Sequence, residues 1–100
     1  MPQDLSAVLR EQLPLPGPYV APRSATERDL AGIWREAFGM DRVGVEDDFN
    51  DLGGDSLIAT IMFAMIRESF GLAVPMAALA ASPTIARLAV RIDDLKRGAA

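Results

Sequence analysis

Residues 24–39 read SATERDLAGIWREAFG, a stretch with the signals of one complete amphipathic helix. Ser24 and Glu27 have the spacing of a capping box, in which two side chains satisfy free N–H groups of the first turn. Thr26 is a second candidate for the N-cap. Apolar residues then recur at helical spacing and form one stripe: Leu30, Ile33, Trp34, Ala37 and Phe38. Gly39 suits the end of the helix, so this stretch predicts a helix with one buried face.

Two more helices are predicted next along the chain. The second should span residues 56–70 and end at Gly71. One side of its helical wheel is expected to face the core, and it carries Ala59, Met62, Phe63, Ile66 and Phe70. Pro75 at a first helical position predicts a short third helix that runs to about Ala81.

The fourth helix is expected to have Ser82 as its N-cap, followed by Pro83. Its apolar stripe is Ile85, Leu88, Ala89, Ile92 and Leu95, and Gly98 lies beyond its expected end. Alternation typical of strands is short everywhere, and hairpin turn pairs are missing. The predicted fold class is all-α, a four-helix bundle with a long loop between helices one and two and a short third helix.

The loop over residues 41–55 combines acidic and apolar residues. Its acidic residues are Asp41, Glu46, Asp47, Asp48, Asp51 and Asp55, and its apolar ones are Val43, Val45, Phe49 and Leu52. We expect the apolar side chains to hold the loop on the core, with a short turn of helix over residues 47–52, and the acidic ones to be solvated. A loop of this length is uncommon in a compact domain unless it has a function.

The N-terminal residues differ from the rest of the chain. A short helix is predicted over residues 5–13, and a proline-rich stretch over residues 14–22 follows it. Because proline fixes φ and lacks a backbone donor, this stretch is predicted to be an extended linker. We therefore divide the chain into an N-terminal linker, residues 1–22, and one globular domain, residues 23–97.

Composition excludes several classes of function. The chain has no cysteine and no histidine, which excludes disulfides and thiolate metal sites and removes the commonest general base. Its formal net charge is −4, which gives no electrostatic reason to bind nucleic acid. The N-terminus lacks a signal-peptide pattern, and no apolar run is long enough to span a bilayer. We expect a cytoplasmic protein without nucleic-acid or membrane partners.

Gly53-Gly54-Asp55-Ser56-Leu57 ends the loop and opens the second helix. The glycines allow positive φ and leave space beside the Ser56 hydroxyl. A helix start favours a phosphate there by about 0.3–1 kcal/mol. Taken alone, Ser56 is better explained as an ordinary N-cap, because Ser or Asp before an apolar helix is very common. A nucleophilic serine would need a base, and Lys96 would serve only if the fold brought it close.

The chain resembles a peptidyl carrier (thiolation) domain of nonribosomal peptide synthetases, which belongs to the phosphopantetheine-binding acyl carrier superfamily. The segments that carry the resemblance occur in order and with fitting lengths: Tyr-Val-Ala-Pro-Arg at 19–23, Trp34, Val-Gly-Val-Glu-Asp-Asp-Phe at 43–49, Leu-Gly-Gly-Asp-Ser-Leu-Ile-Ala-Thr at 52–60 and Ser-Pro-Thr-Ile at 82–85. The likeness covers about residues 19–92 and implies a bundle of the acyl-carrier type.

The resemblance implies that Ser56 is the attachment point of 4′-phosphopantetheine, which a phosphopantetheinyl transferase donates from coenzyme A. Gly53, Gly54, Asp55 and Leu57 match the rest of the motif and would help the transferase to dock. The thiol of the arm would hold an aminoacyl or peptidyl group, which also accounts for the missing cysteine. The implied chain is a non-catalytic carrier, monomeric by default, with adenylation, condensation, tailoring or thioesterase partners.

Leu13-Pro14-Leu15-Pro16 resembles the Leu-Pro-x-Pro element that joins an adenylation domain to its carrier. That likeness suggests descent or excision from a synthetase module. The start at Met1 and the short segment after the fourth helix fit a free-standing carrier equally well.

The second helix has a further apolar face, formed by Leu57, Ile58, Ile61 and Met65. A helix of a small bundle rarely needs two apolar faces. In one interpretation the loop or the third helix covers this face, above all at Leu57 and Ile58. In the other, Ile61 and Met65 belong to a docking patch for partners, which Met76 and Leu79 on the third helix extend. Carriers of this family often have a basic residue here, so the expected partner groove is unusually apolar.

Three alternatives compete with the peptidyl carrier. An acyl carrier of fatty acid or polyketide synthesis shares the Asp-Ser-Leu core and the cofactor, but here Glu68 is the only acid of the second helix. A calcium-binding EF-hand fails because Leu52 and Ala59 would occupy two ligand positions. A helical interaction module would explain the second apolar face but leave the Gly-Gly-Asp-Ser motif unused.

Overall fold

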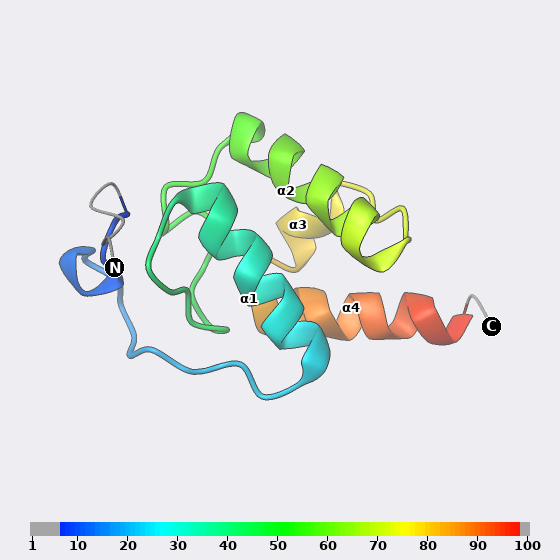
Figure 1. Cartoon of the computed structure of the whole chain (residues 1–100), viewed down its shortest axis with the longest axis horizontal. Coiled ribbons are helices and arrows are strands. Elements are labelled where there is room, and N and C mark those ends of the chain that lie inside the picture. The colour runs from blue at the N-terminus through cyan, green and yellow to red at the C-terminus, as the bar shows by residue number, and fades with distance from the viewer. Residues whose placement is uncertain (1–6, 99–100) are drawn as a thin grey trace, which may run out of the picture.

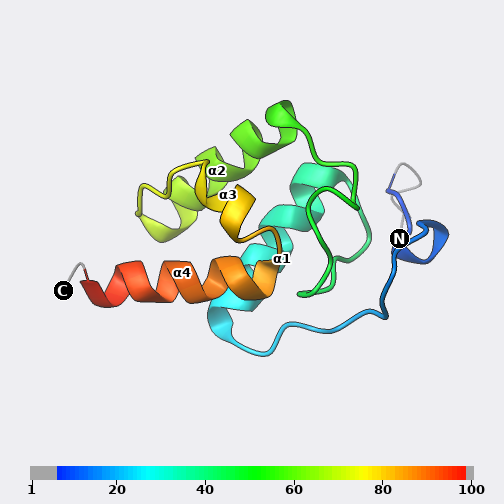
Figure 2. The same ribbon diagram turned by 180° about the vertical axis from the view of Figure 1, so that it is seen from behind.

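Four α-helices and their connections form the part of the chain that the computed structural model describes, residues 7–98. The helices are α1 (Ala25–Phe38), α2 (Ser56–Phe70), α3 (Ala78–Ala81) and α4 (Ile85–Gly98), and a 3-10 turn, η1 (Arg10–Gln12), precedes them. α1 packs against both α2 and α4, and α3 lies between α2 and α4 (Figure 1, Figure 2). The prediction of an all-α fold with a long first loop and a short third helix is confirmed. Within residues 7–98, the helices are too short or too polar to cross a membrane.

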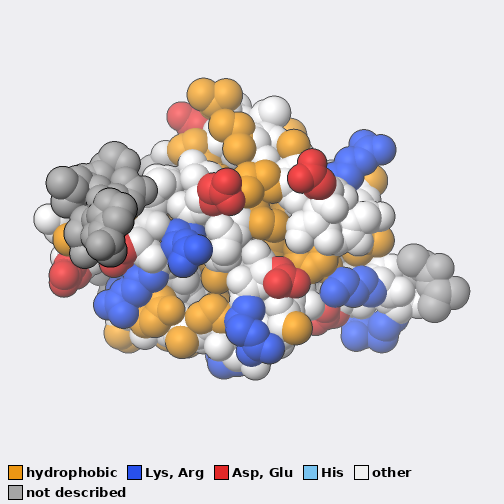
Figure 3. Space-filling model, in the orientation of Figure 1, with side chains coloured by type: hydrophobic (Ala, Val, Ile, Leu, Met, Phe, Trp, Pro, Cys, Tyr) orange, Lys and Arg blue, Asp and Glu red, His pale blue; other side chains and the backbone are white. Residues whose placement is uncertain are grey.

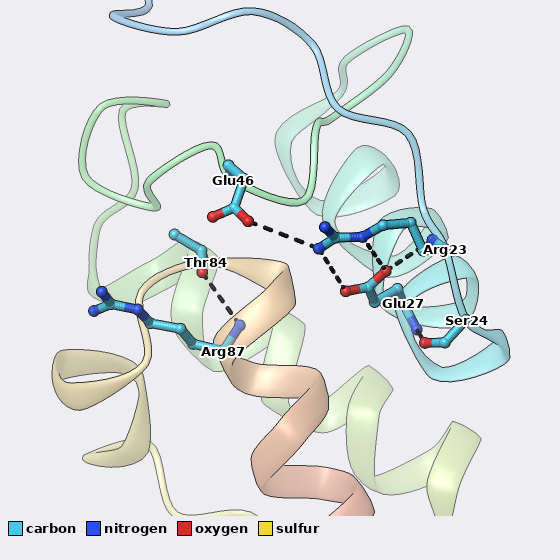
Figure 4. A network of polar contacts seen from close by, with 6 residues as sticks. All are labelled: Arg23, Ser24, Glu27, Glu46, Thr84 and Arg87. Carbon is cyan, nitrogen blue, oxygen red and sulfur yellow. Dashed lines mark hydrogen bonds and ion pairs between the residues drawn. The ribbon is translucent and has the colours of Figure 1, made fainter.

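The start of α1 confirms Ser24 as the N-cap. Its hydroxyl oxygen accepts a hydrogen bond from the backbone N–H of Glu27, at 3.1 Å (Figure 4). Thr26 is not the cap, because its hydroxyl donates to Asp93 of α4 instead. The Glu27 carboxylate accepts from the backbone N–H of Arg23, one residue before the cap. The Glu27 side chain therefore ties the preceding chain to the helix through Arg23.

The predicted apolar stripes of α1, α2 and α4 meet in one core. The largest side chains that are fully buried include Leu30, Trp34, Met62, Ile66, Ile85, Leu88 and Ile92. The stripes loosen toward the helix ends, where Phe38 and Phe70 are half-buried and Leu95 is exposed. Both α1 and α2 stop at a glycine with φ of 68°, Gly39 and Gly71, as predicted.

The loop over residues 41–55 lies on the core through the four apolar side chains predicted to hold it there. Val43, Val45, Phe49 and Leu52 are all buried. The expected helical turn over residues 47–52 is reduced to a single bond from Leu52 N–H to the carbonyl of Asp48, without a helix. Side-chain burial, not local secondary structure, therefore determines the path of this loop.

The third and fourth helices begin later than predicted. Pro75 opens a series of tight turns, with Ala78 N–H bonded to the carbonyl of Pro75, and α3 itself starts only at Ala78. The N-cap of α4 is Thr84, not Ser82, since Thr84 Oγ1 accepts from Arg87 N–H at 3.2 Å (Figure 4). Gly98 is the last residue of α4 rather than a residue beyond it.

The reason for the shifted start of α4 is a long-range contact. The carbonyl of Pro83 accepts a hydrogen bond from Phe49 N–H of the loop, at 2.8 Å. In a helix capped by Ser82, that carbonyl would instead accept a bond from within the helix. Because this carbonyl oxygen accepts a hydrogen bond from the loop, the helix begins two residues later.

The N-terminal segment is only partly as predicted. Residues 5 and 6 of the expected helix lie outside the described residues, and the remainder forms only the three-residue turn η1. Residues 14–22 contain no helix or strand, in agreement with an extended chain. Val8 pairs with Met40 in a single β-bridge, so part of this segment contacts the domain.

Candidate functional site

Two glycines shape the turn before α2, and each is required for a different reason. Gly53 has φ of +90°, a backbone conformation that favours glycine, and its surroundings are open. Gly54 is required for space, because a Cβ built on it would overlap the ring of Phe49. The N–H of Gly54 also donates to the carbonyl of Phe49 at 3.0 Å. The chain therefore folds back tightly over Phe49 just before it enters the helix.

Asp55, not Ser56, is the N-cap of α2. Its carboxylate accepts from Ile58 N–H at 2.9 Å, and its carbonyl accepts from Ala59 N–H. Ser56 is the first helical residue and is exposed. Among the described residues, its hydroxyl oxygen takes part in no hydrogen bond of the cap. The interpretation of Ser56 as an ordinary cap is therefore wrong, and its hydroxyl is free for modification.

The environment of Ser56 fits an attached phosphate. In the described part of the chain, the backbone N–H groups of Ser56 and Leu57 donate to no protein acceptor, as expected at the open end of a helix. These amides and the helix dipole favour an anion by about 0.3–1 kcal/mol. The Asp55 carboxylate offsets part of that attraction. The helix end thus accommodates a phosphate without binding one strongly.

A hollow beside Ser56 offers room for an arm. Its volume is about 370 Å³, and it opens to solvent. The loop and the start of α2 form one wall, with Phe49, Asn50, Gly54, Asp55, Ser56 and Ala59, and the chain around α3 forms the other, with Met76, Leu79 and Ala80. The sequence analysis named Phe49 and Ala59 only as core-facing residues and did not name Asn50 or Ala80, since small and polar residues give no signal without the fold. An arm attached to Ser56 would start at the edge of this hollow.

The predicted docking residues divide into three groups by exposure. Leu57, Ile61 and Met76 are exposed by 69, 44 and 45%. Ile58 and Met65 are half-buried and pack against the core. Leu79 lines the hollow but is only 7% exposed, so it is too buried to extend an exposed patch. Met76 lies before α3 rather than on it. Figure 3 shows hydrophobic side chains gathered over the end of the molecule where α2 begins.

The fold places Lys96 far from Ser56. Its ammonium nitrogen lies 5.0 Å from the ring centre of Phe70, the last residue of α2, whereas Ser56 is the first. A helix of this length separates the two ends by about 20 Å, at 1.5 Å per residue. Lys96 therefore does not serve as a base for Ser56, and the sequence has no histidine that would.

The sequence analysis expected all acidic residues of the loop to be solvated, but one of them is buried. Asp47 is buried, and its carboxylate pairs with the guanidinium of Arg10 at 2.6 and 2.7 Å. The hydrogen bond to Asp47 raises the pKa of Arg10 above its ordinary value, against the opposing effect of burial. The signal for burial was the alternation of Val43, Val45, Asp47 and Phe49, in which every second residue points inward.

Comparison with known proteins identifies the family of the chain. The sequence model of the family described as "phosphopantetheine attachment site" matches residues 28–92, well over half of the chain. Tyrocidine synthase 3 of Brevibacillus parabrevis is 41% identical over 88 residues, which cover 88% of this chain and 1% of that protein. The chain thus spans a very small fraction of this curated relative.

Two solved structures share the fold as well as the sequence. One is a peptidyl carrier protein in complex with the phosphopantetheine transferase Sfp and coenzyme A, with 36% identity, a TM-score of 0.73 and coverage of 76% of this chain and 99% of that one. The other is an active-site mutant of a peptidyl carrier protein, with 34% identity, a TM-score of 0.74 and coverage of 79 and 88%. Four helices, a long first loop and a short third helix are therefore the acyl-carrier fold. The chain belongs to the phosphopantetheine attachment site family, as a carrier domain of the peptidyl type.

Proposed function

We propose that this carrier holds an aminoacyl or peptidyl group as a thioester on a 4′-phosphopantetheine arm attached to Ser56. The observation that supports this residue is its free hydroxyl, exposed at the first position of α2 while Asp55 caps the helix. The open hollow beside it gives an arm room to leave the surface. The arm supplies the thiol, which a chain without cysteine does not contain.

Loading would be carried out by a phosphopantetheinyl transferase. Ser56 Oγ forms the new bond to phosphorus, the phosphoanhydride bond of coenzyme A breaks, and adenosine 3′,5′-bisphosphate leaves. The proton of the hydroxyl passes to a base of the transferase, since the chain has no histidine and Lys96 lies at the other end of α2. Gly53, Gly54, Asp55 and Leu57 surround the hydroxyl and are the residues that a docked transferase would contact first.

The mass of the intact protein tests the attachment residue. Incubation with coenzyme A and a broad-specificity transferase should add the mass of one phosphopantetheine, and Ser56→Ala should abolish the gain. Ser69→Ala is the matched control, since Ser69 is an exposed serine of the same helix. A gain that persists in Ser56→Ala, or that Ser69→Ala removes, would place the arm on another residue.

We further propose that Leu57, Ile61 and Met76 form the exposed patch on which partner enzymes dock. All three are exposed apolar side chains near the arm's attachment point. The expected partners are an adenylation enzyme and condensation, tailoring or thioesterase enzymes of nonribosomal peptide or related natural-product synthesis. Loading consumes coenzyme A, and these enzymes act on the loaded carrier. We therefore expect the carrier to be in the cytoplasm.

Serine substitution tests the patch. Ile61→Ser with Met76→Ser should leave helicity and loading intact and slow aminoacylation by a cognate adenylation enzyme. Val90→Ser is the control, because Val90 is an exposed apolar residue on α4, away from the patch. Equal aminoacylation rates in the double variant and the control would exclude the patch.

An acyl carrier of polyketide or fatty acid synthesis is the second candidate. It shares the attachment chemistry, and only the cargo distinguishes the two. Glu68 is the only acid on α2 and Arg67 precedes it, so this helix lacks the acidic surface expected of a fatty acid carrier. Incubation of the loaded carrier with amino-acid-activating or acyl-transferring enzymes, followed by mass measurement, discriminates between them.

A further inference from the structure

Residues 7–20, here called the strap, run alongside the α1–α2 loop at one end of the molecule (Figure 1, Figure 2). Near its start, Val8 N–H donates to the carbonyl of Gly39 at 2.8 Å, and Asp41 N–H donates to the carbonyl of Val8 at 2.9 Å. At its end, Val45 N–H donates to the carbonyl of Val20 at 2.9 Å. The family model matches only from residue 28, so the strap lies outside the residues that this model covers.

The centre of the strap contributes a buried ion pair. Arg10 Nε donates to Asp47 Oδ2 at 2.7 Å and its Nη2 donates to Asp47 Oδ1 at 2.6 Å, in a bidentate arrangement. The two side chains are 8 and 5% exposed. The same Nη2 reaches the carbonyl of Gly17 at 3.1 Å and so closes the strap on itself. Asp47 Oδ2 also accepts from Gly44 N–H, which fixes the bend of the loop.

Close packing accompanies the ion pair. A Cβ built at Gly44 would lie 3.1 Å from both Asp47 Oδ2 and the backbone nitrogen of Val20. The ring of Tyr19 has the guanidinium carbon of Arg42 at 4.3 Å from its centre and that of Arg10 at 5.6 Å. The strap therefore packs against the loop as closely as the segments within a single domain pack against each other.

A short series of contacts leads from this pair to Ser56. Phe49 follows Asp47 by two residues, and both its N–H and its carbonyl are bonded, to Pro83 and to Gly54. Its ring covers Gly54, which directly precedes the cap Asp55. A loop held at Asp47 therefore holds the turn that positions Ser56.

We propose that the strap is an integral part of this carrier and that Arg10, through its ion pair with Asp47, is a positioning residue for the turn that presents Ser56. The proposal rests on Ser56 as the attachment site. Buried ion pairs add little net stability compared with apolar residues of similar size, and their best-attested use is to fix one arrangement among several. The predicted boundary at residue 23 then lies inside the packed unit, which begins with the strap.

Amide exchange of the full chain tests whether the strap is docked. The N–H groups of Asp41 and Val45, bonded to strap carbonyls, should be protected, and Arg10→Met should speed their exchange by about tenfold or more. Arg10→Lys should restore part of the protection, since it keeps the charge but not the bidentate geometry. Arg97→Met, which removes an exposed ion pair of α4, is the control and should change neither amide. Unprotected amides in the parent chain would overturn the proposal.

Loading kinetics separate positioning from stability. Arg10→Met leaves the buried Asp47 unpaired and should lower the melting temperature by about 10 °C or more. Arg10→Met with Asp47→Asn removes both charges while the amide oxygen still accepts from Gly44, so most of that loss should be recovered. In both variants the KM of the transferase should rise about threefold to tenfold with kcat little changed, because less of the carrier holds the competent turn.

A double variant with the KM of the parent chain would show that Arg10 affects stability only, and the positioning role would be wrong. A parent chain that is not loaded at Ser56 would refute the proposed function instead. The exchange measurement would still decide whether the strap is docked.

Discussion

The two connections that flank α2 are built on opposite principles. The loop over residues 41–55 has almost no secondary structure, yet its hydrogen bonds reach the strap at Val20, the start of α4 at Pro83 and its own buried Asp47. In residues 72–81, the hydrogen bonds found in the described chain join residues no more than four positions apart. The first connection is fixed by distant parts of the molecule and the second mainly by itself.

This difference matters because the two connections form opposite walls of the hollow beside Ser56. Phe49 and Gly54 belong to the wall with long-range hydrogen bonds, which also carries Ser56, the proposed attachment residue. Met76, Leu79 and Ala80 belong to the wall with local hydrogen bonds. Regions with few long-range contacts open at lower free energy. Ser56 is thus held by the wall with long-range hydrogen bonds, here called the firm wall, and we expect the other, softer wall to adapt to an arm or a partner.

The largest effect should come from removing the ring that organises the firm wall. Phe49 lies edge-on to Trp34 and Phe38, with ring centres 5.9 and 5.4 Å apart. Phe49→Ala should cost about 3–5 kcal/mol of unfolding free energy, as for other buried aromatic residues. Leu79→Ala, on the soft wall, should cost about 2 kcal/mol, at the low end for a buried leucine. Urea unfolding followed by Trp34 fluorescence measures both, and a larger loss for Leu79→Ala would invert the comparison.

A smaller effect should distinguish the two glycines of the turn. Gly54→Ala should cost about 1–3 kcal/mol by overpacking, because its Cβ would overlap the Phe49 ring. Gly53→Ala should cost about 1–2 kcal/mol by backbone strain alone, since φ is +90° and the surroundings are open. In a Phe49→Leu background the cost of Gly54→Ala should fall while that of Gly53→Ala stays the same. Unfolding of the single and double variants gives the coupling energy between each glycine substitution and Phe49→Leu. Equal coupling energies for Gly53 and Gly54 would contradict overpacking at Gly54 and backbone strain at Gly53 as the separate causes.

The same contrast explains how far the sequence alone predicts this molecule. The bounds of α1 and α2 follow from local signals, namely a cap at Ser24, the turn before Ser56 and a glycine at each end, so they are predicted correctly. The inward residues of the long loop are also visible, because apolar side chains within an acidic loop need a place to be buried. What remained hidden depends on distant partners. Asp47 is buried because it pairs with Arg10, which lies 37 positions away in the sequence. The helix α4 starts late because Phe49 N–H donates to the carbonyl of Pro83.

The candidate site shows the same limit. Ser56 is recognisable from its motif, but the motif does not tell which residue caps the helix, and the structure assigns that role to Asp55. Leu57 and Ile61 are exposed as the helical wheel of α2 predicts, whereas Ile58 and Met65 on the same face pack against the core. The burial of Leu79 depends on how α3 lies between two other helices, which no local pattern records.

The smallest predicted effect concerns one more tether of the firm wall. Arg23 pairs with Glu27 at the start of α1 and reaches Glu46 of the loop at 3.7 Å (Figure 4). The hydrogen bonds from Arg23 lower the pKa of Glu27, an effect that burial partly opposes. A carboxyl whose pKa is lower in the folded chain stabilises the fold above its unfolded value, about 4.3, and loses that contribution as the pH falls through the folded value.

The stability of the parent chain relative to Glu27→Gln should therefore be constant from pH 7 to about pH 5 and should shrink below about pH 4.3. Glu36→Gln, an exposed glutamate of the same helix, controls for the loss of one negative charge. Urea unfolding across this pH range measures the difference for each pair. A difference that stays constant down to pH 3, or that grows as the pH falls, would mean that the charge of Glu27 does not hold Arg23. The tether between α1 and the loop would then rest on Glu46 alone, which is too exposed and too distant to fix Arg23.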